Sequence, residues 1–295
     1  MGLRIGIDLG GTNVRVALVN EKGSIVEFLQ ASTESEKGYQ QVIEKMSLMI
    51  EKVSEGAEID GIGIGAPGPL DIKKGVILSP PNLPGWDNIP LVEILSGKFG
   101  TPVFLNNDAN VAALAEANVG SGVGYESVFY ITVSTGIGGG FVINNKLFNG
   151  AHGYAGEVAN MIIDPNGYQH SVLNKGSFEG LASGTSIGRR AEQDFGITGG
   201  AKQVFTLAAE GNEQARKIID ETVTYLAMGI ANIAHTVNPE LFVMGGGVME
   251  SIEFILLPLQ EKVKKFLFPE LASSIKIVPA SLTGKAGVIG AAMLV

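Results

Sequence analysis

The first twenty residues alternate between apolar positions and small or polar ones. Apolar side chains occupy every second position over residues 5–9 and again over residues 14–18. A period of two is typical of β-strands, because successive side chains point to opposite faces of a sheet. Two adjacent glycines lie between the runs, so the pattern predicts a strand, a glycine turn and a returning strand. Residues 24–29 form a further apolar run that extends this predicted sheet.

The spacing then becomes helical. Residues 39–53 carry apolar side chains three or four positions apart, which predicts an amphipathic helix. Residues 61–68 alternate glycine with apolar residues and predict a strand that ends in a Gly-Pro turn. The remaining predicted elements are a strand at 103–105, a helix from 107, a strand at 127–133, a glycine turn at 134–140, a returning strand at 141–143, a helix over 213–236, a strand at 241–244 with a turn at 245–247, a Pro-interrupted helix over 251–267, a strand near 275–278 and a helix from 284.

The unit of strand, glycine turn and strand occurs twice, at 4–19 and at 127–143. This repetition indicates an internal duplication with one sheet in each half. No low-complexity linker separates the halves, so we expect an α/β chain whose domains meet at short crossings near residues 109 and 280. The expected domains are residues 1–109 plus 281–295, a small N-terminal domain, and residues 110–280, a large domain.

Composition narrows the function. The chain has 295 residues and is 45% hydrophobic, which is enough for a sizeable core. Its 41 glycines are about twice the ordinary share and have no collagen period, so they indicate tight turns and close backbone approaches. With 21 Lys and Arg against 30 Asp and Glu, the net charge is -9. That charge disfavours non-specific binding to nucleic acid or an anionic membrane, but backbone amides can still bind a phosphorylated ligand.

There is no cysteine, which excludes disulfides, thiol catalysis and cysteine-ligated metals. No apolar run reaches the roughly 18 residues of a membrane span, and the N-terminus lacks a signal-peptide pattern. We therefore expect a cytoplasmic protein.

The first glycine turn has the composition of a phosphate site. The backbone N–H groups of such a turn converge on one point, which suits phosphate oxygens. Gly10 and Gly11 supply the turn, Thr12 and Asn13 add side-chain donors, and Asp8 places a carboxylate that would hold Mg²⁺ through water. The alternative is an ordinary hairpin, since short glycine motifs are weak evidence on their own.

The second glycine turn, residues 134–140, contains four glycines and two hydroxyl side chains. Consecutive glycines weaken a strand, which favours a ligand contact over a plain hairpin. Ser134, Thr135, Gly136 and Gly138 are the candidate phosphate contacts. The chain contains no G-x-x-x-x-G-K-[ST] motif, so neither turn is a P-loop.

Asn107 and Asp108 follow a predicted strand and open a predicted helix. One of them is expected to cap that helix. A carboxylate at a helix N-terminus is stabilised in its ionised form, and an ionised Asp can accept the proton of a hydroxyl that attacks a phosphoryl group.

Three further segments leave alternatives open. Glu157 and Glu179 lie in glycine-rich loops, where solvated surface carboxylates are common. Residues 245–247 are glycines after an apolar strand, and they fit either a flat base or a helix-entry turn. The three histidines are not spaced like metal ligands.

In this order along the chain, the motifs resemble the ROK family of bacterial sugar kinases, which have the two-domain ribonuclease-H-like, actin-type ATPase fold with duplicated sheets. The resemblance covers nearly the whole chain. It rests on residues 8–12, 63–68, 82–86, 107–110, 134–140 and 238–247.

The resemblance implies an ATP-dependent hexose kinase, with glucose as the default substrate and Mg-ATP in an interdomain cleft. It implies Asp108 as the catalytic base. The implied sugar-binding residues are Gly68, Asn82, Asn107, Asp108, Glu157, Asn160 and Glu179. The implied nucleotide-binding residues are Asp8, Gly10, Gly11, Thr12, Asn13, Ser134, Thr135, Gly136, Gly138, Gly245, Gly246 and Gly247.

The chain departs from the family at one motif. ROK members typically carry a histidine and a cysteine-rich stretch that bind a structural zinc, but Asn160 stands in the histidine's place here. His170, Val172 and Ser177 fall where the cysteines would be. We expect no zinc, because zinc needs about four N, S or O ligands.

Several alternatives remain open from the sequence. The sugar could instead be fructose, mannose, an N-acetylhexosamine or a β-glucoside, and the donor could be ATP or polyphosphate. A different reading is a non-catalytic sugar sensor. The predicted first strand starts near Arg4, which leaves no room before it for the DNA-binding helices of ROK repressors. We expect a homodimer or larger homo-oligomer that binds no nucleic acid and no membrane.

Overall fold

The fold is that of a computed structural model, which describes residues 2–295. Its contacts divide the chain into two compact units. The first unit comprises the chain up to Gly124 together with Gly140–Ala155 and Ser281–Val295, and the second comprises Tyr125–Gly139 and Gly156–Ala280. The C-terminal segment thus belongs with the N-terminal one.

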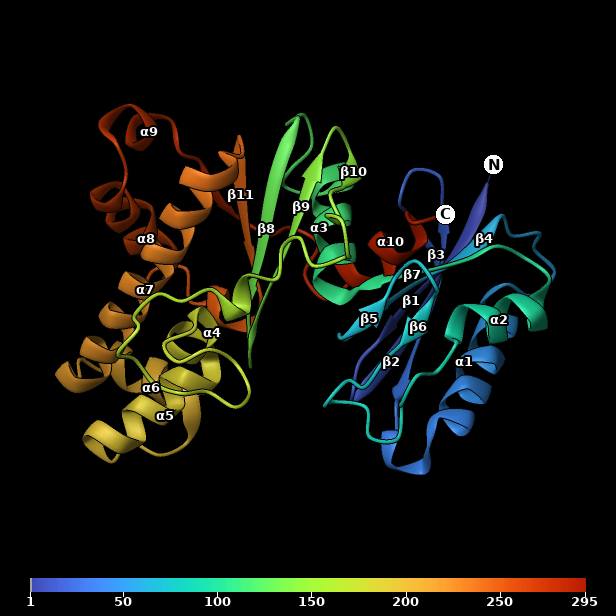
Figure 1. The fold of residues 1–295 in the computed structure, drawn as a ribbon, viewed down its shortest axis with the longest axis horizontal. Helices are drawn as coiled ribbons and strands as arrows, with labels where there is room; N and C mark the ends of the chain where they lie inside the picture. The colour runs from blue at the N-terminus through green and yellow to red at the C-terminus, as the bar shows by residue number, and fades with distance from the viewer. Residues whose placement is uncertain (1) are drawn as a thin grey trace. The chain divides into compact units, whose positions relative to one another are not determined.

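The first unit is built on a five-stranded sheet with the strand order β3-β2-β1-β4-β7 (Figure 1). β1 (Leu3–Leu9) and β2 (Asn13–Asn20) form an antiparallel hairpin, and β3 (Ile25–Ser32) continues it. On the other side of β1, β4 (Gly61–Ala66) and β7 (Val103–Asn107) run parallel to it. The alternating pattern of residues 4–19 therefore folds as predicted.

The strand register gathers polar residues at one edge of this sheet. Asp8 on β1 lies beside Gly65 on β4, and Gly65 lies beside Asn106 on β7. Because these strands are parallel, their carboxyl ends lie at the same edge of the sheet. In α/β proteins, ligands commonly bind at that edge. Asp8 and the start of the helix after β7 are consequently close neighbours in the sheet.

Two helices cover one face of the sheet. α1 (Tyr39–Val53) and α2 (Leu91–Phe99) contribute buried side chains to one core with β1, β2, β4 and β7. The predicted amphipathic helix over 39–53 is confirmed, with Met46 and Ile50 fully buried on its inner face.

On the other side of the sheet, α10 (Ala286–Ala292) contacts β1, β4 and α3 (Asp108–Val119). Apolar side chains of α10 pack here, and its backbone also contacts the sheet directly. A methyl group at Gly6 would overlap the Val288 carbonyl oxygen, and one at Gly63 would overlap that of Ala291. These glycines are therefore explained by a close approach of helix and sheet.

Glu116 on α3 is fully buried and joins distant parts of the first unit. Its carboxylate accepts hydrogen bonds from the Ser121 N–H at 2.9 Å, from the N–H and hydroxyl of Ser281 at 3.2 and 3.3 Å, and from the Leu282 N–H at 2.7 Å. These donors satisfy a buried charge that would otherwise be costly.

The sequence analysis placed residues 110–119 in the large domain, but α3 belongs to the first compact unit.

The second five-stranded sheet has the order β10-β9-β8-β11-β12. β8 (Ser127–Val133), β11 (Leu241–Gly245) and β12 (Ile277–Pro279) are parallel. β9 (Ile137–Ile143) and β10 (Lys146–Leu147) form an antiparallel pair. Both predicted sheets are therefore present.

A long helix organises the rest of the second unit. α7 (Glu213–Val237) contacts α4, α5, α6 and α8. Phe178 at the start of α4 is fully buried, and Gly229 on α7 leaves the space that its ring occupies. The other helices are α4 (Phe178–Ala182), α5 (Gly184–Phe195), α6 (Gly200–Ala209), α8 (Leu256–Lys262) and α9 (Pro269–Ser274).

Short elements complete the chain. A small hairpin joins β5 (Leu70–Asp71) and β6 (Val76–Ile77), and the 3-10 helices are η1 (Ser35–Lys37), η2 (Val158–Asn160), η3 (Gly247–Glu250) and η4 (Val263–Phe266). Among residues 2–295, no helix is long and apolar enough to cross a membrane.

Two details differ from the sequence prediction. The glycine turn ends earlier than residue 140, because β9 already begins at Ile137. Gly139 and Gly140 lie within that strand and make room for protein atoms, since a Cβ would lie 2.8 Å from the Gly156 oxygen and 2.7 Å from the Ala113 Cβ respectively. The helix predicted over 251–267 begins only at Leu256 and continues as η4.

The contact between α10 and the sheet yields a prediction for stability. Gly63→Ala should lower the free energy of unfolding by about 1–3 kcal/mol, because the added methyl group forces α10 away from β4. Gly97→Ala in α2 is the matched control, because a methyl group there meets nothing within 4 Å. It should stabilise the protein by about 0.5–1 kcal/mol. Urea unfolding measures both values, and equal stabilities of the two variants would contradict the proposed contact.

Candidate functional site

The first glycine turn is held in place by the segment that follows β3. Within the turn, the Gly10 N–H donates to the Asn13 oxygen at 2.9 Å. The Thr33 hydroxyl donates to the Gly10 oxygen at 2.6 Å, and the Thr33 N–H donates to the Thr12 oxygen at 2.8 Å. Thr33 is fully buried. The carbonyl groups of the turn are thus engaged on the protein side.

The backbone N–H groups of the turn, in contrast to its carbonyl groups, are suited to bind an anion. In the described part of the chain, the N–H groups of Gly11 and Thr12 donate to no protein acceptor. Gly11 also packs on the loop that carries Asn82, since a Cβ on Gly11 would lie 2.5 Å from the Asn82 oxygen. The structure therefore brings a predicted phosphate turn and a predicted sugar residue together.

Asp8 lies at the end of β1 beside this turn. Its Oδ2 accepts from the Arg15 guanidinium at 2.7 Å, directly across the β1–β2 hairpin. Gly287 leaves the space beside it, because a Cβ there would lie 2.8 Å from the Asp8 Cγ. Arg15 engages one carboxylate oxygen, and the other is compatible with a water-mediated Mg²⁺. This donor set fits magnesium, which is often held by a single carboxylate together with phosphates.

Asp108 is the first residue of α3, and its surroundings fix it. Asn107 is the N-cap, and its side chain accepts from the Ala109 N–H at 2.9 Å. The Asp108 Oδ1 accepts from the same N–H at 2.7 Å. A Cβ on Gly68 would lie 3.7 Å from the Asn107 Nδ2, so Gly68 is beside Asn107. The sequence predicted both the cap and the carboxylate, and α3 has both.

Asparagines behind Asp108 form a network that the sequence analysis did not identify. The Asn106 Oδ1 accepts from the Asn107 N–H at 2.8 Å and from the Asn110 Nδ2 at 2.9 Å. The Asn106 Nδ2 donates to the Asn149 Oδ1 at 2.9 Å. Asn106 and Asn110 are buried. These bonds tie the start of α3 to Asn149, while the buried Asn110 Oδ1 has no hydrogen-bond partner among the described residues.

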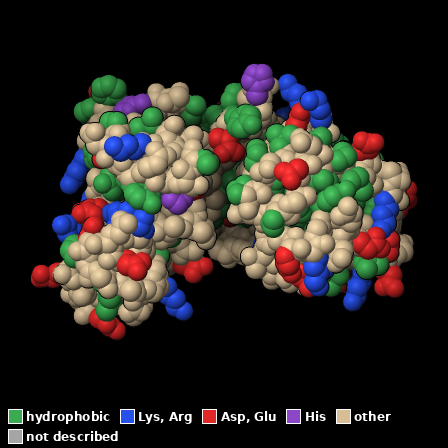
Figure 2. Space-filling model, turned by 60° about the horizontal axis from the view of Figure 1, so that its bottom comes forward, with side chains coloured by type: hydrophobic (Ala, Val, Ile, Leu, Met, Phe, Trp, Pro, Cys, Tyr) green, Lys and Arg blue, Asp and Glu red, His purple; other side chains and the backbone are tan. Residues whose placement is uncertain are grey.

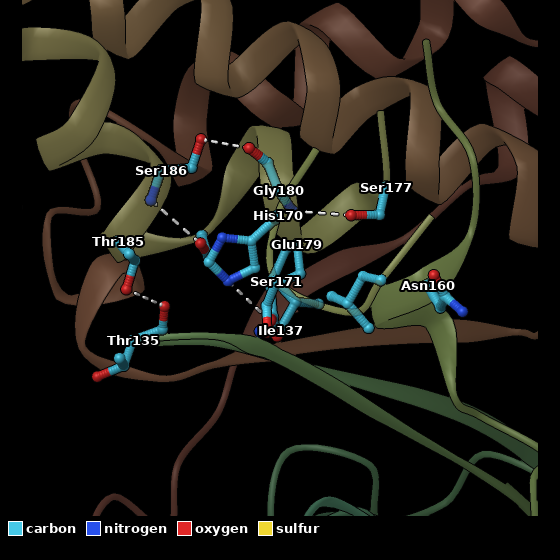
Figure 3. A network of polar contacts seen from close by, with 12 residues as sticks. Thr135, Ile137, Asn160, His170, Ser171, Ser177, Glu179, Gly180, Thr185 and Ser186 are labelled. Atoms are coloured by element: carbon cyan, nitrogen blue, oxygen red, sulfur yellow. Dashed lines mark hydrogen bonds and ion pairs between the residues drawn. The ribbon is translucent and has the colours of Figure 1, made fainter. Parts of the chain in front are cut away.

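The second glycine turn is tied to α4 and α5 (Figure 3). The Ile137 N–H donates to the Glu179 Oε2 at 2.8 Å, and Gly136 lies against the same carboxylate. The Gly184 N–H donates to the Ser134 oxygen at 2.7 Å. The Thr185 hydroxyl donates to the Thr135 oxygen at 2.8 Å. The structure thus joins a predicted phosphate turn to a predicted sugar carboxylate within the second unit.

Glu157 has an unusual electrostatic environment. Burial of its carboxyl group raises its pKa, and the negative charge of Glu179 raises the pKa further. Part of the Glu157 residue is nevertheless exposed. A raised pKa at a partly exposed carboxyl group is a feature of functional sites.

Asn160 holds a loop of the second unit. Its Oδ1 accepts from the Asn174 N–H at 2.5 Å, and its backbone oxygen accepts from the Asn174 Nδ2 at 3.1 Å. No cluster of three or more His, Cys, Asp or Glu side chains suited to a metal occurs among residues 2–295. With hydrogen bonds at Asn160 and no thiolates, the donor set of this segment does not fit zinc.

The glycines at the end of β11 and directly after it have separate explanations. Gly245 lies against the Tyr130 ring, and Gly246 has φ +90° and lies against the Val133 oxygen. Only at Gly247 does a Cβ meet nothing within 4 Å. Packing therefore accounts for Gly245 and Gly246, while Gly247 leaves open space.

The predicted residues fall into two groups by unit. Asp8, Gly10–Asn13, Gly68, Asn82, Asn107 and Asp108 belong to the first unit, and Ser134–Gly138, Glu157, Asn160, Glu179 and Gly245–Gly247 belong to the second. Thr33, Asn106, Asn149 and His170 were not predicted as functional, because their contacts join segments distant in sequence.

The chain matches the model of the ROK family over residues 4–295. It is 35% identical over 305 residues to the glucokinase of Thermotoga maritima, a match that covers 99% of this chain and 96% of that protein. It is 29% identical over 298 residues to the xylose repressor of Bacillus spizizenii, a match that covers 100% of this chain and 77% of that protein.

Solved structures give the same picture. The ROK hexokinase of Thermus thermophilus superposes with a TM-score of 0.91 at 33% identity, covering 99% of this chain and 97% of that one. A ROK family glucokinase from Streptomyces griseus, solved with glucose and AMPPNP, gives a TM-score of 0.82 at 32% identity and 99% coverage of both chains. The two-sheet α/β architecture is thus the actin-like ATPase fold of ROK sugar kinases.

The contribution of the Thr33 hydrogen bonds to the first glycine turn can be tested by substitution. Thr33→Val keeps the shape of the side chain but removes the donor to the Gly10 oxygen. We expect a loss of about 1 kcal/mol in the free energy of unfolding and weaker ATP binding, because the turn becomes less ordered. Thr33→Ser keeps the hydroxyl group and is the control. Calorimetric titration measures the ATP affinity. Equal ATP affinity of both variants would show that the Thr33 hydroxyl group does not order the turn.

The raised pKa of Glu157 predicts a pH-dependent stability. The folded chain binds this proton more tightly than the unfolded chain, whose glutamate pKa is near about 4.3. Stability therefore falls as pH rises from there through the raised pKa of Glu157, and the loss is complete above it.

Glu157→Gln removes this loss, so its melting temperature should exceed that of the wild type at pH 7. The difference should shrink as the pH falls and vanish at about pH 3, where both states of the wild type bind the proton. Glu253→Gln, an exposed glutamate of the same unit, is the control. A variant that melts lower than the wild type at pH 7 would show that the carboxylate is stabilising.

Proposed function

The chain belongs to the ROK family, and on that basis we propose that it is an ATP-dependent hexose kinase whose substrate is glucose. The observation that carries the proposal is the fixed carboxylate of Asp108 at the N-terminus of α3. A glycine turn with free N–H groups lies at the same edge of the sheet.

In the proposed reaction, Asp108 acts as the general base. The hexose hydroxyl oxygen forms a bond to the γ-phosphorus of ATP, the bond to the bridging oxygen breaks, and ADP leaves. The hydroxyl proton passes to Asp108. The hydrogen bond from the Ala109 N–H keeps the carboxylate oriented, and the partial positive charge of the helix N-terminus attracts its negative charge.

The remaining residues bind and orient the substrates in this proposal. Sugar hydroxyls are bound by residues around Gly68 and by Asn82, Asn107, Glu157, Asn160 and Glu179. Phosphate oxygens are bound by Gly10, Gly11, Thr12, Asn13, Ser134, Thr135, Gly136 and Gly138, and the base lies on Gly245–Gly247. Asp8 is placed to hold Mg²⁺ through water, and that ion would neutralise phosphate charge when bound.

A sugar-sensing role is the second candidate, because the chain is also similar to a xylose repressor. A sensor needs sugar binding but no base. The structured surroundings of Asp108 favour catalysis. The net charge of -9 disfavours DNA, and on the face drawn in Figure 2 acidic, basic and apolar side chains are interspersed. We also propose that the enzyme acts in the cytoplasm as a homo-oligomer.

The proposal is tested by ADP release with a panel of hexoses. With ATP, glucose should be phosphorylated with the highest kcat/KM, and fructose, mannose, N-acetylhexosamines and a β-glucoside should react more slowly. Polyphosphate replaces ATP in a parallel series. The absence of phosphorylation with every sugar and both donors would leave the sensor as the function.

Asp108→Asn tests the base directly. Its kcat should fall by about 10²–10⁴-fold, because proton transfer in the transition state is lost. Glucose affinity measured by calorimetry should stay within a few-fold of the wild type, since the amide can still form a hydrogen bond. A kcat above about a tenth of the wild-type value would show that another group accepts the proton.

A further inference from the structure

The loop between η2 and α4 is closed by its own backbone. The Ile163 N–H donates to the Gly176 oxygen at 2.9 Å, and the Gly176 N–H donates to the Tyr168 oxygen at 2.8 Å. Gly176 has φ +65° and lies against the Asp164 carbonyl group. Isolated bridges pair Ile162 with Ser177 and Gln169 with Lys175. The loop thus has a defined position, and so does His170 at its turn.

His170 lies against the predicted sugar carboxylate Glu179 (Figure 3). Its Nε2 is 3.5 Å from the Glu179 Oε1, and the two side chains are 25% and 20% exposed. The other carboxylate oxygen, Oε2, accepts from the Ile137 N–H at 2.8 Å. Within the described chain, His170 is the only basic side chain at ion-pair distance from Glu179.

A stack of side chains supports the imidazole from behind. The Tyr168 ring is 6.4 Å from the His170 ring, and the Arg189 guanidinium lies 3.6 Å from the Tyr168 ring centre. Arg189 donates to the Gly180 oxygen at 3.3 Å and to the Ser186 hydroxyl at 3.4 Å. His170 itself lies over the first turn of α4, with its Cβ 3.0 Å from the position of a Cβ on Gly180.

Two observations indicate a function for this contact. Asn160 uses its Oδ1 and its backbone oxygen to hold Asn174, so its side chain is already engaged within the loop. Burial, and to a lesser extent the negative charge of Glu179, raises the pKa of Glu157, so the two carboxylates are close enough to repel each other. A donor on Glu179 offsets that repulsion and fixes the direction of the carboxylate lone pairs.

We propose that His170 is a positioning residue that sets hexose selectivity by orienting Glu179. The inference rests on the proposed kinase function. With Oε2 held by the Ile137 N–H and Oε1 held by His170, the carboxylate presents its remaining lone pairs in one direction. A sugar whose hydroxyl groups donate along that direction is preferred over its epimers. The 3.5 Å separation is longer than a well-formed hydrogen bond, and such contacts tighten when substrate binds.

The test measures the kinetics of four variants on glucose and on its epimers. Phosphorylation is followed by ADP release at saturating ATP. For His170→Ala we expect the KM for glucose to rise about tenfold, in line with the loss of a hydrogen bond to a charged group. The kcat and the KM for ATP should stay within about threefold. The preference for glucose over mannose and galactose should fall, because Glu179 is free to turn.

Two conservative variants distinguish the loss of Glu179 orientation from a general loss of loop structure. The His170→Gln side chain can place its Nε2 near the histidine Nε2, so its KM for glucose should stay near the wild-type value. The His170→Asn side chain is too short to reach Glu179 and should behave like His170→Ala. Val172→Ala, at a 95% exposed position of the same loop, is the matched control and should match the wild type.

The outcomes distinguish this inference from the proposed function. If the wild type phosphorylates a hexose and His170→Ala matches Val172→Ala in KM and selectivity, His170 does not position Glu179 and the kinase function stands. If Gln and Asn variants are equally impaired, loss of loop structure explains the effect and the inference is wrong. If the wild type phosphorylates no sugar, the proposed function itself fails, and the inference that rests on it fails too.

Discussion

The first unit depends on direct contact between the backbone of a helix and the backbone of a sheet. α10 lies so close to β1 and β4 that Gly6 and Gly63 cannot carry side chains. On its other side, Gly290 of α10 lies against the Val111 carbonyl group of α3. This contact fixes α3 relative to the carboxyl edge of the sheet, and α3 begins at Asp108. The position of the candidate base therefore depends on glycine at Gly6, Gly63 and Gly290, because a side chain at any of them would push these backbones apart.

Within each unit, most of the predicted carboxylates have local partners. Asp8 is paired with Arg15 across a hairpin, Asp108 is oriented by the amide of the next residue, and Glu179 is held by one amide and one imidazole. Among residues 2–295 no such partner contacts Glu157, and its pKa is raised by burial and then by the charge of Glu179. Three carboxylates thus have local polar partners, and burial together with the charge of Glu179 raises the pKa of the fourth.

Much of the fold and part of the site could be predicted from the sequence. Apolar alternation identified both sheets, and helical spacing identified α1 and α7, because these signals are local. The Asn107 cap and the Asp108 carboxylate were visible for the same reason. Gly138–Gly140 were interpreted as a turn, since a sequence cannot show that a glycine in a strand makes room for a neighbour. The contacts of Asn106 with Asn149 and of His170 with Glu179 join residues from separate elements, and no local pattern marks such pairs.

The buried Glu116 carboxylate has a consequence for how the chain acquires its structure during synthesis. Three of its four hydrogen bonds come from Ser281 and Leu282, residues that leave the ribosome about 165 positions later. Until then the carboxylate has only the Ser121 N–H of these donors, and the face of the first sheet lacks α10. The second unit, whose last residue is Ala280, is complete before that moment. The unit that is translated first is consequently the last to close, which reverses the usual vectorial order of domain folding.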